Sequence, residues 1–163
     1  ADVTAGDTLY MPAGSVHAIG PGNLIYEIQQ SSDTTYRLFD WNRMGLDGKP
    51  REMHVDKGVQ VSNIDRLPEI TYPVRQEDSA AVTVVSGDFF TTVLHRITED
   101  TPAAANTLGS HFHALTCING TVEIRASENR VTLELGRTAL IPATLGRYAM
   151  HGDEEVLRSI HAV

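Results

Sequence analysis

Short stretches of alternating apolar and polar residues, separated by glycines, dominate the second half of the chain. An alternation of period two is typical of β-strands that bury one face. The pattern predicts strands over residues 81–85, 89–97, 115–118, 121–125, 130–135, 138–141 and 156–161. Many short strands at close spacing indicate a sandwich or barrel, because units that alternate strands with helices need longer intervals.

The first half has weaker signals. Residues 24–29 and 34–41 have the β-branched and aromatic content of strands, and Ser31-Ser32-Asp33 between them is typical of a turn. Residues 51–64 are predicted to form a short helix, and residues 67–78, with two prolines and several charges, an extended linker. A mainly β chain with little helix follows from both halves.

Composition limits the kinds of partner and the cell compartment to be expected for the protein. The chain has 163 residues, of which 41% are hydrophobic and 21% charged, as in ordinary globular proteins. The net charge of −8 argues against nucleic acid or an anionic membrane as a partner. Neither a membrane-spanning apolar run nor the features of a signal peptide are present. A single cysteine, Cys117, fits a reducing cytoplasm, where we expect the protein to act.

Candidate chemistry begins near the start of the chain. Gly6 is followed after five residues by Pro12-Ala13-Gly14, and after two more by His17. This spacing places a tight turn just before a histidine, and resembles the second motif of the cupin superfamily, whose histidine is a metal ligand. Two carboxylates and a guanidinium follow: Glu27, Asp33 and Arg37.

A longer stretch carries a more specific resemblance. MPAGSVHAIG, EIQQSSDTTYRLFDWNR and GKPREMHVDK, within residues 11–57, resemble the C-terminal half of type I mannose-6-phosphate isomerases. The resemblance implies a cupin or jelly-roll β-sandwich. Residues 1–75 would be the C-terminal part of an incomplete catalytic cupin. Residues 76–163 would be a degenerate cupin-like lobe without a complete metal site.

A weak internal repeat supports the interpretation of residues 76–163 as a second, cupin-like lobe. Gly136 to Pro142 repeats the spacing of Gly6 to Pro12, but no histidine follows at the matching place. His111-Phe112-His113 resembles the first cupin motif, yet residues 114–117 lack the carboxylate that would complete it. We therefore expect no physiological metal site in this half.

The resemblance also implies site residues. His17 matches the family's last metal ligand, usually to zinc, and Arg37 matches an active-site arginine. Asp33 and Glu27 match carboxylates that line the sugar pocket. The remaining ligands would lie upstream of this chain. Taken alone, the residues leave simpler interpretations open: a structural histidine beside a turn, a solvent-facing arginine and an aspartate that caps a turn.

The function implied is the interconversion of mannose 6-phosphate and fructose 6-phosphate, through a metal-assisted enediol(ate) proton transfer. The chain alone would be inactive, and its unpaired strand edges favour a homodimer. One alternative is a non-catalytic, cupin-like sugar-binding module or inactive fragment. A third interpretation, an iron dioxygenase, would need a carboxylate beside His111 and His113 that the sequence lacks.

Overall fold

The computed structural model describes residues 2–65, 68–72 and 80–162. The chain divides into two compact units. One is Leu9–Glu69, called the N-terminal unit below, and the other comprises Ala1–Thr8 and Ile70–Val163. Residues 80–162 of the second unit are called the C-terminal lobe. No helix in the described ranges is long and apolar enough to cross a membrane.

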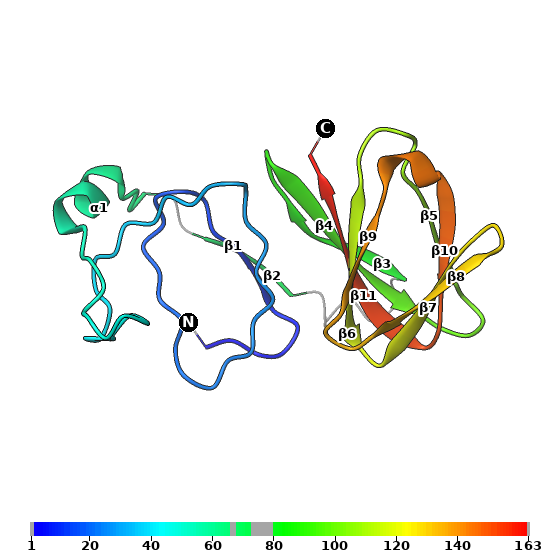
Figure 1. The fold of residues 1–163 in the computed structure, drawn as a ribbon, viewed down its shortest axis with the longest axis horizontal. Helices are drawn as coiled ribbons and strands as arrows, with labels where there is room; N and C mark the ends of the chain where they lie inside the picture. Colours follow the sequence, from blue (N-terminus) through cyan, green and yellow to red (C-terminus); the bar gives the residue numbers. More distant parts are fainter. Residues whose placement is uncertain (1, 66–67, 73–79, 163) are drawn as a thin grey trace. The chain divides into compact units, whose positions relative to one another are not determined.

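The C-terminal lobe is built from two antiparallel sheets (Figure 1). One sheet has the strand order β3-β4-β11-β6-β9 and the other β5-β10-β7-β8. The bounds are β3 Ala81–Ser86, β4 Phe90–Ile97, β5 Ala103–Asn106, β6 His113–Asn119, β7 Thr121–Ala126, β8 Asn129–Glu134, β9 Thr138–Ile141, β10 Arg147–His151 and β11 Glu154–His161. A short 3-10 helix, Ala143–Leu145, precedes β10.

The pairing of these strands is nested. β7 pairs with β8, β6 with β9, β5 with β10, and β4 with β11, so each strand pairs with the one equally far from the β7–β8 turn. This is the pairing of one long hairpin rolled into two sheets, which is a jelly roll. The predicted cupin or jelly-roll β-sandwich is therefore confirmed for this lobe.

The core explains why these sequences form strands. Val122 and Ile124 of β7, and Tyr148 and Met150 of β10, are buried on alternate positions. They join one cluster between the sheets, whose other members include Ile97, Leu115, Cys117, Leu133, Ile141 and Val156. Alternation thus predicted the strands correctly, because each sheet buries one face against the other.

All seven predicted strands of this half are present, with bounds that differ by at most two residues. Two further strands, β5 and β10, were not predicted. Residues 103–106 are three alanines and an asparagine, which carry no strand signal of their own. They form a strand because β10 supplies a partner through four matched positions.

A single glycine forms the turn between β6 and β7. Gly120, in the turn between β6 and β7, has φ +59, and a Cβ atom there would lie 1.8 Å from the Glu154 carboxylate. Any other residue would have to displace the end of the Glu154 side chain. The turn favours glycine for its conformation, because φ is positive there.

The N-terminal unit has little regular structure. β1, Thr8–Tyr10, pairs with β2, Glu69–Thr71, and the helix α1 is only Val55–Val61. The prediction of a helix over residues 51–64 was therefore right in place and too long. β2 falls within the predicted linker, whose residues 67 and 73–78 lie outside the described part of the chain.

The two predicted strands at residues 24–29 and 34–41 were wrong, since neither segment forms a strand. Their apolar side chains are largely exposed: Leu24 completely, Phe39 by 64% and Trp41 by 53%. A strand forms only where a neighbour satisfies its backbone groups, and the described residues supply no such neighbour. Propensity alone therefore could not make these segments strands.

Leu115 tests the origin of the lobe's stability. Its side chain is 0% exposed in β6, whereas Leu140 in the neighbouring β9 is 65% exposed. We expect Leu115→Ala to lower the free energy of unfolding by about 2–5 kcal/mol, because it leaves a cavity in the core. Leu140→Ala should change it by no more than about 0.5 kcal/mol. Urea denaturation of the full chain measures both, and equal effects would contradict the assigned core.

Candidate functional site

The turn before His17 is held from two directions. The Ser15 backbone N–H donates to the Pro12 carbonyl at 3.1 Å, and the Asn63 N–H donates to the Gly14 carbonyl at 2.9 Å. Gly14 has φ +87, and a Cβ atom there would lie 2.6 Å from the Val61 carbonyl oxygen. The glycine predicted by the motif is thus required for the turn to approach the end of α1.

His17 presents one ring nitrogen outward. Its side chain is exposed, and its Nδ1 lies 2.9 Å from the Ser15 carbonyl oxygen. A carbonyl only accepts, so Nδ1 carries the proton and Nε2 is left with a free lone pair. Metal-binding histidines are commonly oriented by such a bond to a backbone carbonyl. The imidazole is therefore prepared to act as a ligand through Nε2.

Arg37 is tied to the other end of α1 through its backbone. The Arg37 N–H donates to Nδ1 of His54 at 3.3 Å, and the His54 N–H donates to the Arg37 carbonyl at 2.8 Å. His54 stands directly before α1 and is half-buried. Its ring also packs against Tyr36, with centroids 5.9 Å apart.

An ion pair reinforces the same connection. Nε of Arg51 donates to Oδ2 of Asp40 at 2.6 Å, and Nη2 donates to Oδ1, so the contact is bidentate. Asp40 is buried. The hydrogen bond from Arg51, followed by the charges of Arg51, Arg37 and Arg43, outweighs burial and lowers the pKa of Asp40. The segment that carries Arg37 is thereby fixed to the residues that lead into α1.

Helix α1 is thus a common support for the two candidate groups. The seven residues Val55–Val61 span about 10 Å at 1.5 Å per residue. The turn before His17 contacts one end, and the segment of Arg37 is bonded to the other. Gly58, in the middle, is buried against Leu38, whose Cδ2 lies 2.5 Å from the place of a Cβ atom. The helix therefore lies directly on the Arg37 segment.

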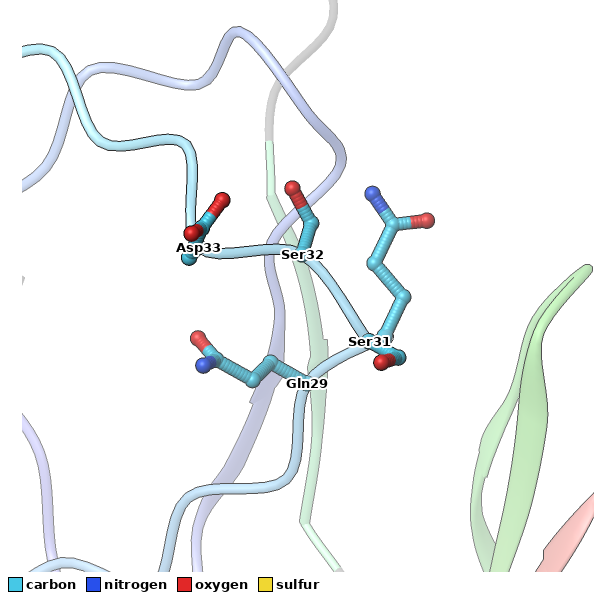
Figure 2. A pocket seen from close by; sticks show the side chains of 5 residues that line it. Gln29, Ser31, Ser32 and Asp33 are labelled. Atoms are coloured by element: carbon cyan, nitrogen blue, oxygen red, sulfur yellow. The ribbon is translucent and has the colours of Figure 1, made fainter.

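The two carboxylates are placed differently. Glu27 is exposed, on a segment that is not a strand. Asp33 lies at a bend beside an open hollow of about 580 Å³, lined by Gln29, Gln30, Ser31, Ser32 and Asp33. Figure 2 shows the Gln29 amide below the backbone that joins Ser32 to Asp33 and the Asp33 carboxylate above it. The hollow is the concave side of one continuous segment.

The described residues contain no cluster of three or more His, Cys, Asp or Glu side chains that could hold a metal ion. The segments that carry His17 and Arg37 both contact α1. Within the described ranges, no contact joins Glu27 or Asp33 to either of these two residues. Sequence reasoning missed the supporting residues His54, Asp40 and Arg51. Only the alternation of arginines and acids over residues 37–52 could have suggested an ion pair there.

Comparison with known proteins identifies the family. The family model described as mannose-6-phosphate isomerase, cupin domain, matches residues 80–161, which is half of the chain. The chain belongs to the mannose-6-phosphate isomerase family. The match covers the jelly roll of the C-terminal lobe, where sequence alone indicated a degenerate cupin.

Curated relatives of the mannose-6-phosphate isomerase family extend the match to the N-terminal unit. The chain is 32% identical to mannose-6-phosphate isomerase ManA of Bacillus subtilis over 159 residues, with 96% of this chain and 50% of that protein covered. It is 33% identical to mannose-6-phosphate isomerase of Streptococcus mutans over 165 residues, with 96% and 49% covered. The chain thus spans about half the length of these relatives.

Solved structures show the same fold. Mannose 6-phosphate isomerase from Bacillus subtilis has a TM-score of 0.63 and 23% identity, over 78% of this chain and 40% of that one. A mannose 6-phosphate isomerase bound with zinc and yttrium has a TM-score of 0.53 and 17% identity, over 71% of this chain and 29% of that one. At these identities the likeness concerns the fold.

The Asp40–Arg51 pair generates a pH prediction. Because the pKa of Asp40 is lower in the folded chain, the pair stabilises the fold above about pH 4, the ordinary value of an aspartate, and this contribution is lost as pH falls through the lowered pKa. We expect Arg51→Gln to reduce stability at pH 7 and to flatten the loss of stability below pH 4. Denaturant titrations at several pH values measure this.

Arg130→Gln is the matched control, since it removes the same charge from a surface pair with Glu123 at 3.6 Å. It should leave stability at pH 7 nearly unchanged. Equal losses in the two variants would mean that the Asp40–Arg51 contact does not fix the segment.

Proposed function

We propose that this chain is part of an aldose-ketose isomerase that interconverts mannose 6-phosphate and fructose 6-phosphate. The observation that carries the proposal is the shared support of α1, which ties the His17 turn and the Arg37 segment to opposite ends of one short helix. The names of the curated relatives support the reaction class. The substrate is accordingly a sugar phosphate.

The chemistry needs three kinds of group. After ring opening, a base removes the proton from C2 of the aldose, an enediolate forms, and a proton returns to C1 as the ketone forms at C2. The negative charge that develops on the oxygen needs a fixed cation. Arg37 suits this role, because a guanidinium stays protonated at every pH of interest and donates in a fixed plane.

Asp33 and Glu27 are proposed as the carboxylates of the sugar pocket. Both are exposed and open to a ligand. Asp33 lines the hollow of residues 29–33, where the amide of Gln29 could bind a sugar hydroxyl beside it. A carboxylate in this position can move a proton during ring opening or transfer, and the substrate would have to order the bend around itself.

Zinc is the proposed cofactor, and the structure fits it in part. His17 has the free Nε2 and the oriented Nδ1 of a zinc ligand. Catalytic zinc takes three protein ligands, and the described residues supply no further member of such a set beside His17. When bound, zinc would supply positive charge at the reacting oxygens.

The competing function is a sugar-binding module without catalysis. Such a module would need groups that bind hydroxyls and phosphate, but it has no need for an imidazole prepared as a metal ligand. The N–H···O contact of His17 therefore favours the isomerase. A boundary near residue 75, a cytoplasmic location and an inactive, dimeric isolated chain stay predictions.

Arg37 tests the mechanism. In a polypeptide that carries this sequence at the full length of its curated relatives, we expect Arg37→Ala to lower turnover by about a hundredfold or more. Zinc content should not change. A coupled assay for fructose 6-phosphate measures the rate, and Arg37→Lys, which keeps the charge without the fork, should recover part of it. Near-normal turnover of Arg37→Ala would remove Arg37 from the mechanism.

His17 tests the metal. We expect His17→Ala to bind zinc far more weakly than the parent, because a ligand of the first coordination sphere is lost. Elemental analysis after dialysis against a weak chelator measures this without reference to activity. His161→Ala, an exposed histidine of the C-terminal lobe, is the control and should keep the parent's zinc. Equal zinc in both variants would refute the assignment of His17.

A further inference from the structure

A cluster of polar side chains lies inside the jelly roll, apart from the site residues His17, Glu27, Asp33 and Arg37. It comprises His95 of β4, His113 of β6, Tyr148 of β10 and Arg158 of β11. In the sheet, β11 lies between β4 and β6, with Val156 opposite His95 and Ile160 opposite His113. Arg158 stands midway between Val156 and Ile160 and so shares their face, the face on which Val156 joins the core.

Two members of the cluster, His113 and Tyr148, contact each other across the two sheets. Nδ1 of His113 lies 2.8 Å from the Tyr148 hydroxyl, and the Arg158 guanidinium hydrogen-bonds that hydroxyl as well. Burial, followed by the charge of Arg158, lowers the pKa of His95 to about 4 and also lowers that of His113. Both imidazoles are therefore neutral at pH 7, and Arg158 is the cation of the cluster.

Two buried nitrogens of this cluster have no hydrogen-bond partner in the described part of the chain: Nε2 of His95 and Nε of Arg158. His95 is only 6% exposed, so its nitrogen is enclosed. An enclosed polar atom without a partner is costly, and an enclosed charge without a counter-charge more so. Among the described residues, no carboxylate forms an ion pair with Arg158.

These groups together have the chemistry of an anion site. Neutral His95 can donate from Nε2 and Arg158 donates from Nε. The Tyr148 hydroxyl is a third donor in the tautomer in which Nδ1 of His113 carries the proton and donates to it. Arg158 as a whole is half-buried, although its Nε atom is buried. A cation would be repelled by Arg158, and a neutral sugar would leave its charge without a partner.

We propose that His95, Tyr148 and Arg158 form a binding site for a small oxyanion, phosphate or carboxylate, within the jelly roll of the C-terminal lobe. This proposal holds whether or not the chain is part of an isomerase. An oxyanion gives His95 and Arg158 the acceptor that each lacks, in a surrounding where charge-assisted hydrogen bonds are strong. The ligand could carry its oxyanion as a phosphate ester or as a carboxylic acid.

The test is a titration of the isotope-labelled full chain with inorganic phosphate, followed by nuclear magnetic resonance, and a parallel titration with acetate. We expect saturable shifts of the His95 ring and of backbone amides in β4, β10 and β11. The probe that saturates at the lower concentration identifies the preferred class. Absence of saturable shifts with both probes would mean that water satisfies these nitrogens, and would overturn the proposal.

Variants locate the site. Arg158→Gln should weaken binding about tenfold or more, because it removes the charged donor. Arg137→Gln removes the same charge at an exposed position and should leave binding unchanged. Tyr148→Phe keeps the ring in the core and deletes one donor, so it tests the site should Arg158→Gln fail to fold. Binding unaffected by Tyr148→Phe and by whichever arginine variant folds would overturn the proposal.

Discussion

An extended chain needs a neighbour for its backbone N–H and C=O groups, and this requirement governs the whole structure. In the C-terminal lobe the nested pairing around the β7–β8 turn supplies such neighbours from within the lobe. Even the alanine-rich segment 103–106 becomes a strand there, because β10 lies beside it. In the N-terminal unit, segments with much better strand propensity remain irregular. Pairing rather than propensity therefore decides which residues are strands.

Where ladders are missing, a few specific contacts fix the chain instead. The Asp40–Arg51 pair and the two bonds between Arg37 and His54 hold two segments together that no sheet joins. Gly14 and Gly58 then allow close approach to α1 at its end and on its side. Such contacts fix the backbone at and near Arg37 and His17. The ends of these two side chains are left accessible to a ligand or metal.

The sequence predicted the strands of the C-terminal lobe well and those of the N-terminal unit poorly. Both outcomes depend on whether a strand has a pairing partner. In β7 and β10, buried residues alternate with more exposed ones: Val122, Ile124, Tyr148 and Met150. The alternation in the sequence matches the folded structure because both sheets that form the core lie within this chain. Leu24 and Phe39 carry the same kind of pattern without a partner in the described residues. The motif around His17 predicted its turn, since Gly14 is fixed by local geometry. The role of His54 depends on a contact across seventeen residues, which no local pattern contains.

The polar cluster of the C-terminal lobe bears on which ligand its interior can accept. His113 belongs to a pair of histidines that resembles a metal motif, but metal binding needs neutral or negative donors around a cation. Here Arg158 supplies a fixed positive charge beside His113 and His95, and no carboxylate of the described residues pairs with it. The same charge that disfavours a metal favours an anion. Burial, followed by that charge, lowers the pKa of both imidazoles, so each is neutral and keeps one N–H to donate. A single arginine on the central strand is thus enough to reverse the sign of the ligand that the interior can accept.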